Sequence, residues 1–178
     1  WFDGATTAGL EHITLRHLLC HASGLTRDGA TTHWFGAPFP DREALVAQVA
    51  SLPVLEPLQA LKYSNVAYTV AGQVIEAVTG DRYEQHVTET LLAPLGLTGT
   101  TPDLPTGEAA LASHATGYGI WRPDRARPPV APVSARVMNS ATGFSSTVND
   151  LLRWYQAHRL GSGDLLDDHH KREMQRVH

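Results

Sequence analysis

Lysine and cysteine are scarce in this chain of 178 residues, which has two lysines, Lys62 and Lys171, and one cysteine, Cys20. A single cysteine excludes an internal disulfide, but it does not distinguish an oxidising compartment from a reducing one. The first residues also lack the basic and apolar regions of a signal peptide. The sequence therefore leaves the localisation open.

Long apolar runs and clustered positive charge are also missing. The longest mostly apolar stretch, from Val66 to Val78, contains Gln73 and Glu76 and is shorter than the roughly 20 residues that span a bilayer, so it predicts a helix of a soluble protein. The net charge is -4 and the fourteen Lys and Arg residues are scattered. We therefore expect no nucleic acid partner and no membrane span.

Hydrophobic periodicity predicts a mostly helical chain. The clearest helix follows Ser64, where apolar residues recur at helical spacing until Gly80 ends the pattern. Gly24 is expected to end a first short helix. The charged residues of the last helix indicate a solvent-facing surface. The expected elements are helices at 15–21, 42–51, 65–79, 83–92, 148–160 and 168–177, a strand at 115–121, and loops at 26–40 and 123–132.

Tyr63, Ser64 and Asn65 stand directly before the clearest helix. A tyrosine, with a reference pKa of about 10, acts as a base near neutral pH only where positive charge favours the phenolate. The structural alternative is a helix start, with Ser64 or Asn65 as the N-cap and Tyr63 packed as a hydrophobic staple. These three residues alone favour the structural alternative.

The wider sequence resembles the superfamily of penicillin-binding proteins and class C β-lactamases. The similarity runs from Tyr63 through residues 94–97 (PLGL) to Thr100, and residues 13–25 and 141–152 match in the right order. There are departures from the usual pattern. Two threonines of the family are replaced by Cys20 and Ala22, and a double glycine is replaced in 141–144 (ATGF). These positions are structural in the resemblance, so they affect the subfamily rather than membership.

The resemblance implies a role for each residue of this motif. Tyr63 would accept the proton of a serine nucleophile and pass it to the leaving group, Asn65 would orient a lysine and bind the substrate, and Ser64 would be a spacer. The family's Ser-x-x-Lys motif is absent, because Gln59 and Asp168 stand three residues before the two lysines. The Lys-Thr-Gly or His-x-Gly motif is absent too, since no lysine or histidine has a glycine two residues later.

We therefore expect residues 1–178 to form a single helical region, mostly α with minor β, that is the helical lobe and the middle of a larger α/β β-lactamase-like serine hydrolase. The resemblance implies that the intact enzyme hydrolyses an ester, amide or β-lactam through an acyl-serine intermediate, with no metal or organic cofactor. The chain alone, without a nucleophile, is expected to be inactive and to self-associate through apolar surface that a sheet would cover. The alternative is a noncatalytic binding or scaffolding domain derived from the same fold.

Four other patterns indicate weaker candidates. Adjacent residues in 167–170 (DDHH) point in different directions on a helix, which disfavours a metal site. His17 and His21 have i,i+4 spacing but no accompanying Glu-x-x-His, so we interpret them as structural. The segment 143–147 (GFSST) resembles a Gly-x-Ser-x-Gly elbow but ends in threonine, and its Ser145 is interpreted as the start of a capped helix. Cys20 has no neighbouring base in sequence and is interpreted as a buried, inert thiol.

Overall fold

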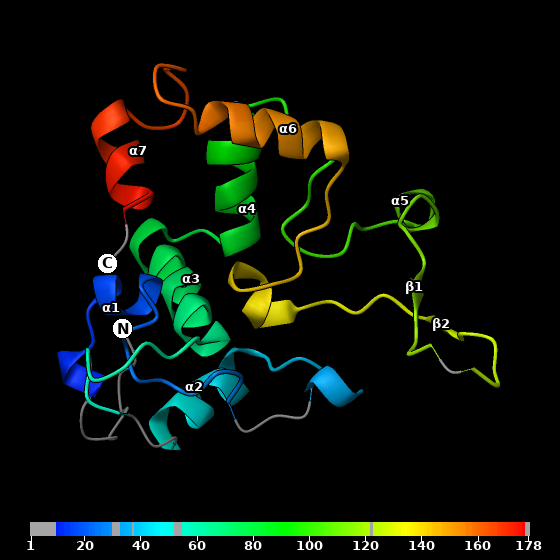
Figure 1. The fold of residues 1–178 in the computed structure, drawn as a ribbon, viewed down its shortest axis with the longest axis horizontal. Helices are drawn as coiled ribbons and strands as arrows, with labels where there is room; N and C mark the ends of the chain where they lie inside the picture. The colour runs from blue at the N-terminus through cyan, green and yellow to red at the C-terminus, as the bar shows by residue number, and fades with distance from the viewer. Residues whose placement is uncertain (1–9, 30–32, 37, 52–54, 122, 177–178) are drawn as a thin grey trace.

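The computed structural model describes residues 10–29, 33–36, 38–51, 55–121 and 123–176. Within these residues the protein is mostly helical with one small sheet, which confirms the predicted fold class (Figure 1). The helical elements are η1 (Leu10–His12), α1 (Leu15–Leu19), η2 (His33–Phe35), α2 (Arg42–Ser51), α3 (Asn65–Thr79), α4 (Tyr83–Val87), η3 (Thr88–Leu92), α5 (Glu108–Ala112), η4 (Arg136–Ser140), α6 (Val148–Ala157) and α7 (Asp168–Met174).

Helix α3 is the central element, with α1 beside it and α2 and α4 at its two ends (Figure 1). Its N-cap is Ser64, whose hydroxyl accepts a hydrogen bond of 2.9 Å from the Ala67 amide. Its C-cap is Gly80, which adopts the left-handed conformation at φ 80° and donates its amide to the Glu76 carbonyl. The predicted bounds of this helix are confirmed because both signals lie in the local sequence.

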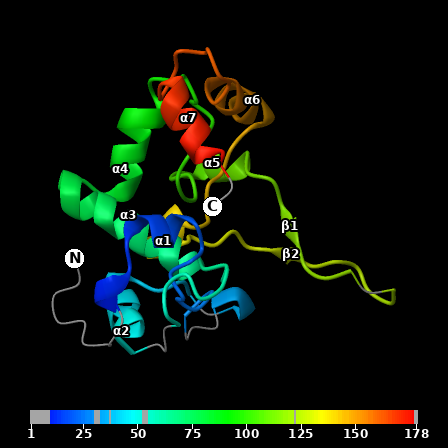
Figure 2. The ribbon, with the colours of Figure 1, turned by 60° about the vertical axis from the view of Figure 1, so that its left-hand side comes forward.

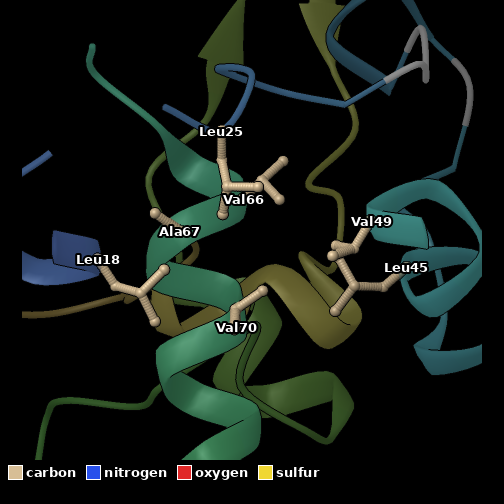
Figure 3. Packing of buried hydrophobic residues seen from close by; sticks show 7 residues of the cluster. All are labelled: Leu18, Leu25, Leu45, Val49, Val66, Ala67 and Val70. Carbon is tan, nitrogen blue, oxygen red and sulfur yellow. The ribbon is translucent and has the colours of Figure 1, made fainter. Parts of the chain in front are cut away.

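The main hydrophobic core joins α3 to α1, to the loop after α1 and to α2. In Figure 3 the side chains of these elements surround the N-terminal half of α3, with Leu18 on one side and Leu45 and Val49 on the other. Fully burying an aliphatic side chain stabilises a fold by about 1.5–3 kcal/mol, so this cluster fixes the N-terminal half of α3. Its members are Leu18, Leu25, Leu45, Val49, Val66, Ala67 and Val70.

The sheet is smaller than the sequence indicates. The predicted strand at 115–121 is reduced to β1 (Gly117–Tyr118), which pairs antiparallel with β2 (Pro129–Val130) inside the predicted loop. Figures 1 and 2 both show this hairpin extending away from the helices. Proline has no amide hydrogen to donate to a ladder, and a proline-rich partner strand therefore limits the pairing.

Two helix predictions are wrong in detail. The predicted helix 15–21 ends at Leu19 with Cys20 as its C-cap, so Gly24 does not end it. The last helix is not wholly solvent-facing, because Lys171 of α7 is only 1% exposed. The Lys171 ammonium donates to the Arg159 carbonyl at 3.2 Å and to the Ser162 hydroxyl at 2.6 Å, which joins α7 to the loop after α6.

Replacing Gly72 by alanine is expected to destabilise the protein by about 1–3 kcal/mol, even though alanine is the better helix former. A Cβ on Gly72 would lie 2.2 Å from the Ser140 hydroxyl and 2.5 Å from the Ser140 Cβ. Urea unfolding followed by circular dichroism measures the change. The Ser140→Gly variant lacks the clashing atoms. The double variant Gly72→Ala/Ser140→Gly should therefore be more stable than Ser140→Gly alone. A stabilised Gly72→Ala variant would contradict the close packing of α3 on η4.

Candidate active site

The two predicted site residues lie together at the N-terminal end of α3, but in different environments. The Tyr63 side chain is 55% exposed, whereas Asn65 is only 8% exposed. Between them, Ser64 is completely buried and donates its hydroxyl to the Thr26 carbonyl at 2.8 Å while it caps α3. Ser64 as the N-cap of α3 is therefore confirmed, and its role as a spacer between two catalytic residues stays a prediction. The packing of Tyr63 as a hydrophobic staple stays a prediction.

The loop after α1 accepts hydrogen bonds from the first residues of α3 and from its N-cap. The amides of Asn65 and Val66 both donate to the Arg27 carbonyl, at 2.8 Å and 3.2 Å. The amide of Ser64 donates to Nδ1 of His21 at 3.2 Å. Since the first amides of a helix have no partner within the helix, these acceptors stabilise its first turn and fix its position.

A partly buried polar network extends from Asn65 to the same loop. The Asn65 side-chain amide donates to Oδ1 of Asp28 at 2.6 Å, and Nε of Arg27 donates to Oδ2 at 2.6 Å. The amide oxygen of Asn65 accepts no hydrogen bond from any residue that the structure describes. This network therefore orients the Asn65 side chain and leaves its acceptor atom available to a lysine or a substrate.

The Asp28 carboxyl is held in its charged form. Its partial burial alone would raise its pKa, but hydrogen bonds from Arg27, Asn65 and Trp34 outweigh that effect, and the pKa of Asp28 lies below its usual value. The pKa of Arg27 is raised, first by its hydrogen bond to Asp28 and by the charge of Asp28, and to a smaller extent by the charge of an ionised Tyr63. Arg27 and Asp28 thus form an ion pair beside Asn65.

Acid is expected to release Asn65 only below about pH 4. Because the pKa of Asp28 is lower in the folded state than the unfolded value of about 3.9, its hydrogen bonds stabilise the protein fully above that value and are lost as the pH falls through the folded pKa. The NMR signals of the Asn65 side-chain amide should therefore stay constant from pH 7 to about 4 and shift at lower pH. In the Asp28→Asn control this acid shift should vanish. A shift at higher pH would contradict the ionised Asp28.

The sequence pattern did not identify His21 as a neighbour of Tyr63. Lys62 directly precedes Tyr63 in the sequence, and its ammonium donates to the Gly24 carbonyl at 3.5 Å. The rings of His21 and Tyr63 lie 4.6 Å apart. These contacts join segments about forty residues apart in the chain, and the only available signal was the match of residues 13–25 to the family pattern.

The other candidates have structural roles. The backbone of Ser145 pairs with Thr101 in an isolated bridge, so Ser145 does not begin a helix, and α6 starts at Val148 after the cap Thr147. Helix α6 ends at Ala157 rather than at residue 160. The Cys20 thiol is half-buried rather than fully buried. Asp167 caps α7 through the His170 amide at 2.9 Å.

Across the part of the chain that the structure describes, no group of three or more His, Cys, Asp or Glu side chains could hold a metal ion. Over the same residues, no helix is long and apolar enough to cross a bilayer.

The family model described as Beta-lactamase matches residues 1–178, and the chain therefore belongs to the β-lactamase family of serine hydrolases. A β-lactamase-like protein of Homo sapiens is 34% identical over 125 residues, which are 67% of this chain and 24% of that protein. A Phoma protein named as hydrolase M10 is 33% identical over 111 residues, 59% of this chain and 16% of that protein.

Solved structures of the family have the same fold. A D-stereospecific amidohydrolase from Streptomyces aligns with a TM-score of 0.76 at 26% identity, over 97% of this chain and 54% of the other. A class C β-lactamase aligns with a TM-score of 0.69 at 22% identity, over 86% of this chain and 40% of the other. The chain thus corresponds to about half or less of these enzymes and to a quarter or less of the two curated relatives.

Proposed function

We propose that this chain supplies the tyrosine base of an acyl-serine hydrolase that acts on an ester, amide or β-lactam. The observation that carries the proposal is the pairing of an exposed phenol, Tyr63, with the oriented amide of Asn65 at the start of α3. The Ser-x-x-Lys motif is absent from the 178 residues, so other residues of the intact domain would supply the serine nucleophile and its lysine. The name of the D-stereospecific amidohydrolase neighbour favours an amide substrate.

The chemistry assigned to these residues is proton transfer. A tyrosine can take the proton of a serine hydroxyl as the oxygen attacks the carbonyl, and it can then return that proton to the leaving group. Nearby positive charge favours the phenolate form that this step needs, and in the intact enzyme the lysines of the two motifs absent from this chain would supply that charge. The free oxygen of the Asn65 amide would accept a hydrogen bond from the lysine or from a substrate amide.

The test is covalent labelling followed by intact-protein mass spectrometry. The 178-residue chain and the full-length enzyme are each incubated with a fluorophosphonate and with a β-lactam. We expect a stoichiometric mass increase on the full-length enzyme and none on the chain. An adduct on the chain would place an activated serine within these residues and overturn the proposal. Absence of an adduct on the full-length enzyme would favour the scaffolding alternative.

We also propose that the chain by itself associates through one face of α6. This face carries four exposed apolar side chains at i, i+3, i+4 and i+7, a spacing that normally faces a core. They are Val148 (74% exposed), Leu151 (57%), Leu152 (55%) and Tyr155 (70%). In the intact domain, the sequence that the neighbours have beyond this region would cover the same stripe.

Charge on this stripe is expected to reduce self-association of the chain. Sedimentation velocity at micromolar concentration should show a dimer or larger species for the wild-type chain, and Leu152→Glu should shift it toward the monomer because a carboxylate resists burial in an apolar interface. Val78→Glu is the control, since Val78 is 67% exposed on α3 and lies outside the stripe. A monomeric wild-type chain would show that the stripe alone does not drive association.

A further inference from the structure

We infer that His21 is a positioning residue for the reaction, which holds the Tyr63 phenol in the orientation that proton transfer requires. This inference rests on the proposed role of Tyr63 as base. The Tyr63 hydroxyl makes no hydrogen bond to any described residue, and its side chain is more than half exposed. Something other than burial must therefore orient the ring.

His21 contacts the chain on both sides of Tyr63. Its carbonyl accepts the Lys62 amide at 2.8 Å, and its Nδ1 accepts the Ser64 amide at 3.2 Å. Its ring lies 4.6 Å from the Tyr63 ring, tilted by 41°. One residue thus fixes the peptide before Tyr63, the peptide after it and the ring between them.

The backbone of His21 makes this double contact possible. His21 has a φ of 56°, in the left-handed region, where histidine, asparagine and aspartate are enriched among residues with a side chain. This conformation lets the carbonyl and the imidazole reach the same neighbouring segment. Because Nδ1 accepts from an amide, the neutral ring must carry its proton on Nε2.

His21 is itself held in place from α3. The Tyr68 ring lies 5.1 Å from the imidazole, so that His21 contacts one tyrosine ring before the helix and another on its first turn. The Tyr68 hydroxyl donates to the Leu19 carbonyl at 2.9 Å. Burial raises the pKa of Tyr68, so its hydroxyl stays a donor at neutral pH. His21 therefore positions Tyr63 relative to α1 and α3.

The experiment compares three substitutions of His21 in the full-length enzyme. His21→Asn retains the left-handed backbone and places an amide oxygen near the Nδ1 position. His21→Gln moves that oxygen further along the side chain, and His21→Gly retains only the backbone freedom. Steady-state hydrolysis of a p-nitrophenyl ester gives kcat and KM for each variant, normalised to the folded fraction from circular dichroism.

We expect His21→Gly and His21→Gln to lower kcat by about 100-fold with little change in KM, since a base displaced by about 1 Å loses about that much rate. His21→Asn should recover at least about a tenth of the wild-type kcat, which a merely structural role would not require. In the 178-residue chain, the NMR signal of the Ser64 amide should move in His21→Gly and return toward its wild-type position in His21→Asn.

The two proposals fail in different ways. If Tyr63→Phe abolishes turnover but folded His21→Gly and His21→Gln retain the wild-type kcat, the positioning role is overturned and the proposed base stands. If Tyr63→Phe retains full turnover, the base assignment fails and the role of His21 fails with it. If His21→Gly does not fold, the comparison of His21→Asn with His21→Gln decides. Equal kcat values for these two variants would overturn the inference.

Discussion

Replacing Tyr63 by phenylalanine is expected to lower kcat of the full-length enzyme by about 10²–10⁴-fold, the range that general acid–base groups contribute. The variant should fold normally, because the Tyr63 hydroxyl has no hydrogen-bond partner among the described residues and the ring remains to contact His21. Ester or amide hydrolysis measures the loss, and the thermal midpoint checks the fold. The change removes one oxygen atom, so the effect on rate can be assigned to that atom.

A second tyrosine of the chain provides a matched control. Tyr118 lies in β1 on the projecting hairpin and has the same exposure as Tyr63, 55%. Tyr118→Phe removes an equally exposed hydroxyl far along the chain from the proposed site and should leave kcat unchanged. If both variants retain full activity, the segment 63–65 functions only as the start of α3 and the base belongs to another group.

Local signals explain what the sequence predicted well. The helix α3 is bounded by Ser64 and Gly80, whose side-chain hydroxyl and left-handed backbone act within the first and last turns. The caps Thr14 and Thr147 likewise bond to amides three residues ahead. Each of these interactions depends on a few consecutive residues, so the amino-acid pattern is sufficient to predict it.

Contacts between distant segments explain what the sequence did not predict. The bond between Asn65 and Asp28 spans 37 positions, and the bond between Ser64 and His21 spans 43. No pattern of periodicity or capping links residues at such separations. The prediction therefore named the two residues that the family motif marks, Tyr63 and Asn65, but not the side chains that hold them.

The burial of Lys171 shows the same limit. A helix of charged residues predicts a solvent-facing surface, yet two neutral oxygens of the loop after α6 accept hydrogen bonds from its ammonium group. Whether a lysine is buried depends on acceptors that the tertiary fold brings to it. Composition cannot contain that information.

Replacing Gly24 by alanine is expected to destabilise the protein by about 3 kcal/mol or more, the largest stability effect predicted here. Gly24 has a φ of 76°, and a Cβ at this position would lie 2.1 Å from the Leu55 carbonyl oxygen. The Leu55 amide donates to the Gly24 carbonyl at 3.2 Å, so the two backbones are held together where the added atom would separate them. Urea unfolding of wild type and variant at pH 7 measures the loss.

Gly80→Ala separates backbone strain from the clash. Gly80 has a φ of 80°, close to that of Gly24, but no atom lies within 4 Å of its built Cβ. Its substitution should therefore cost only about 1–2 kcal/mol, the penalty of a left-handed alanine. The difference between the two losses of stability then measures the effect of the close approach of Gly24 to Leu55. Gly24 lies on the same loop as His21, which contacts Tyr63. Equal costs at the two glycines would mean that the loop can move away from Leu55 without loss, and that the contacts positioning Tyr63 tolerate such a movement.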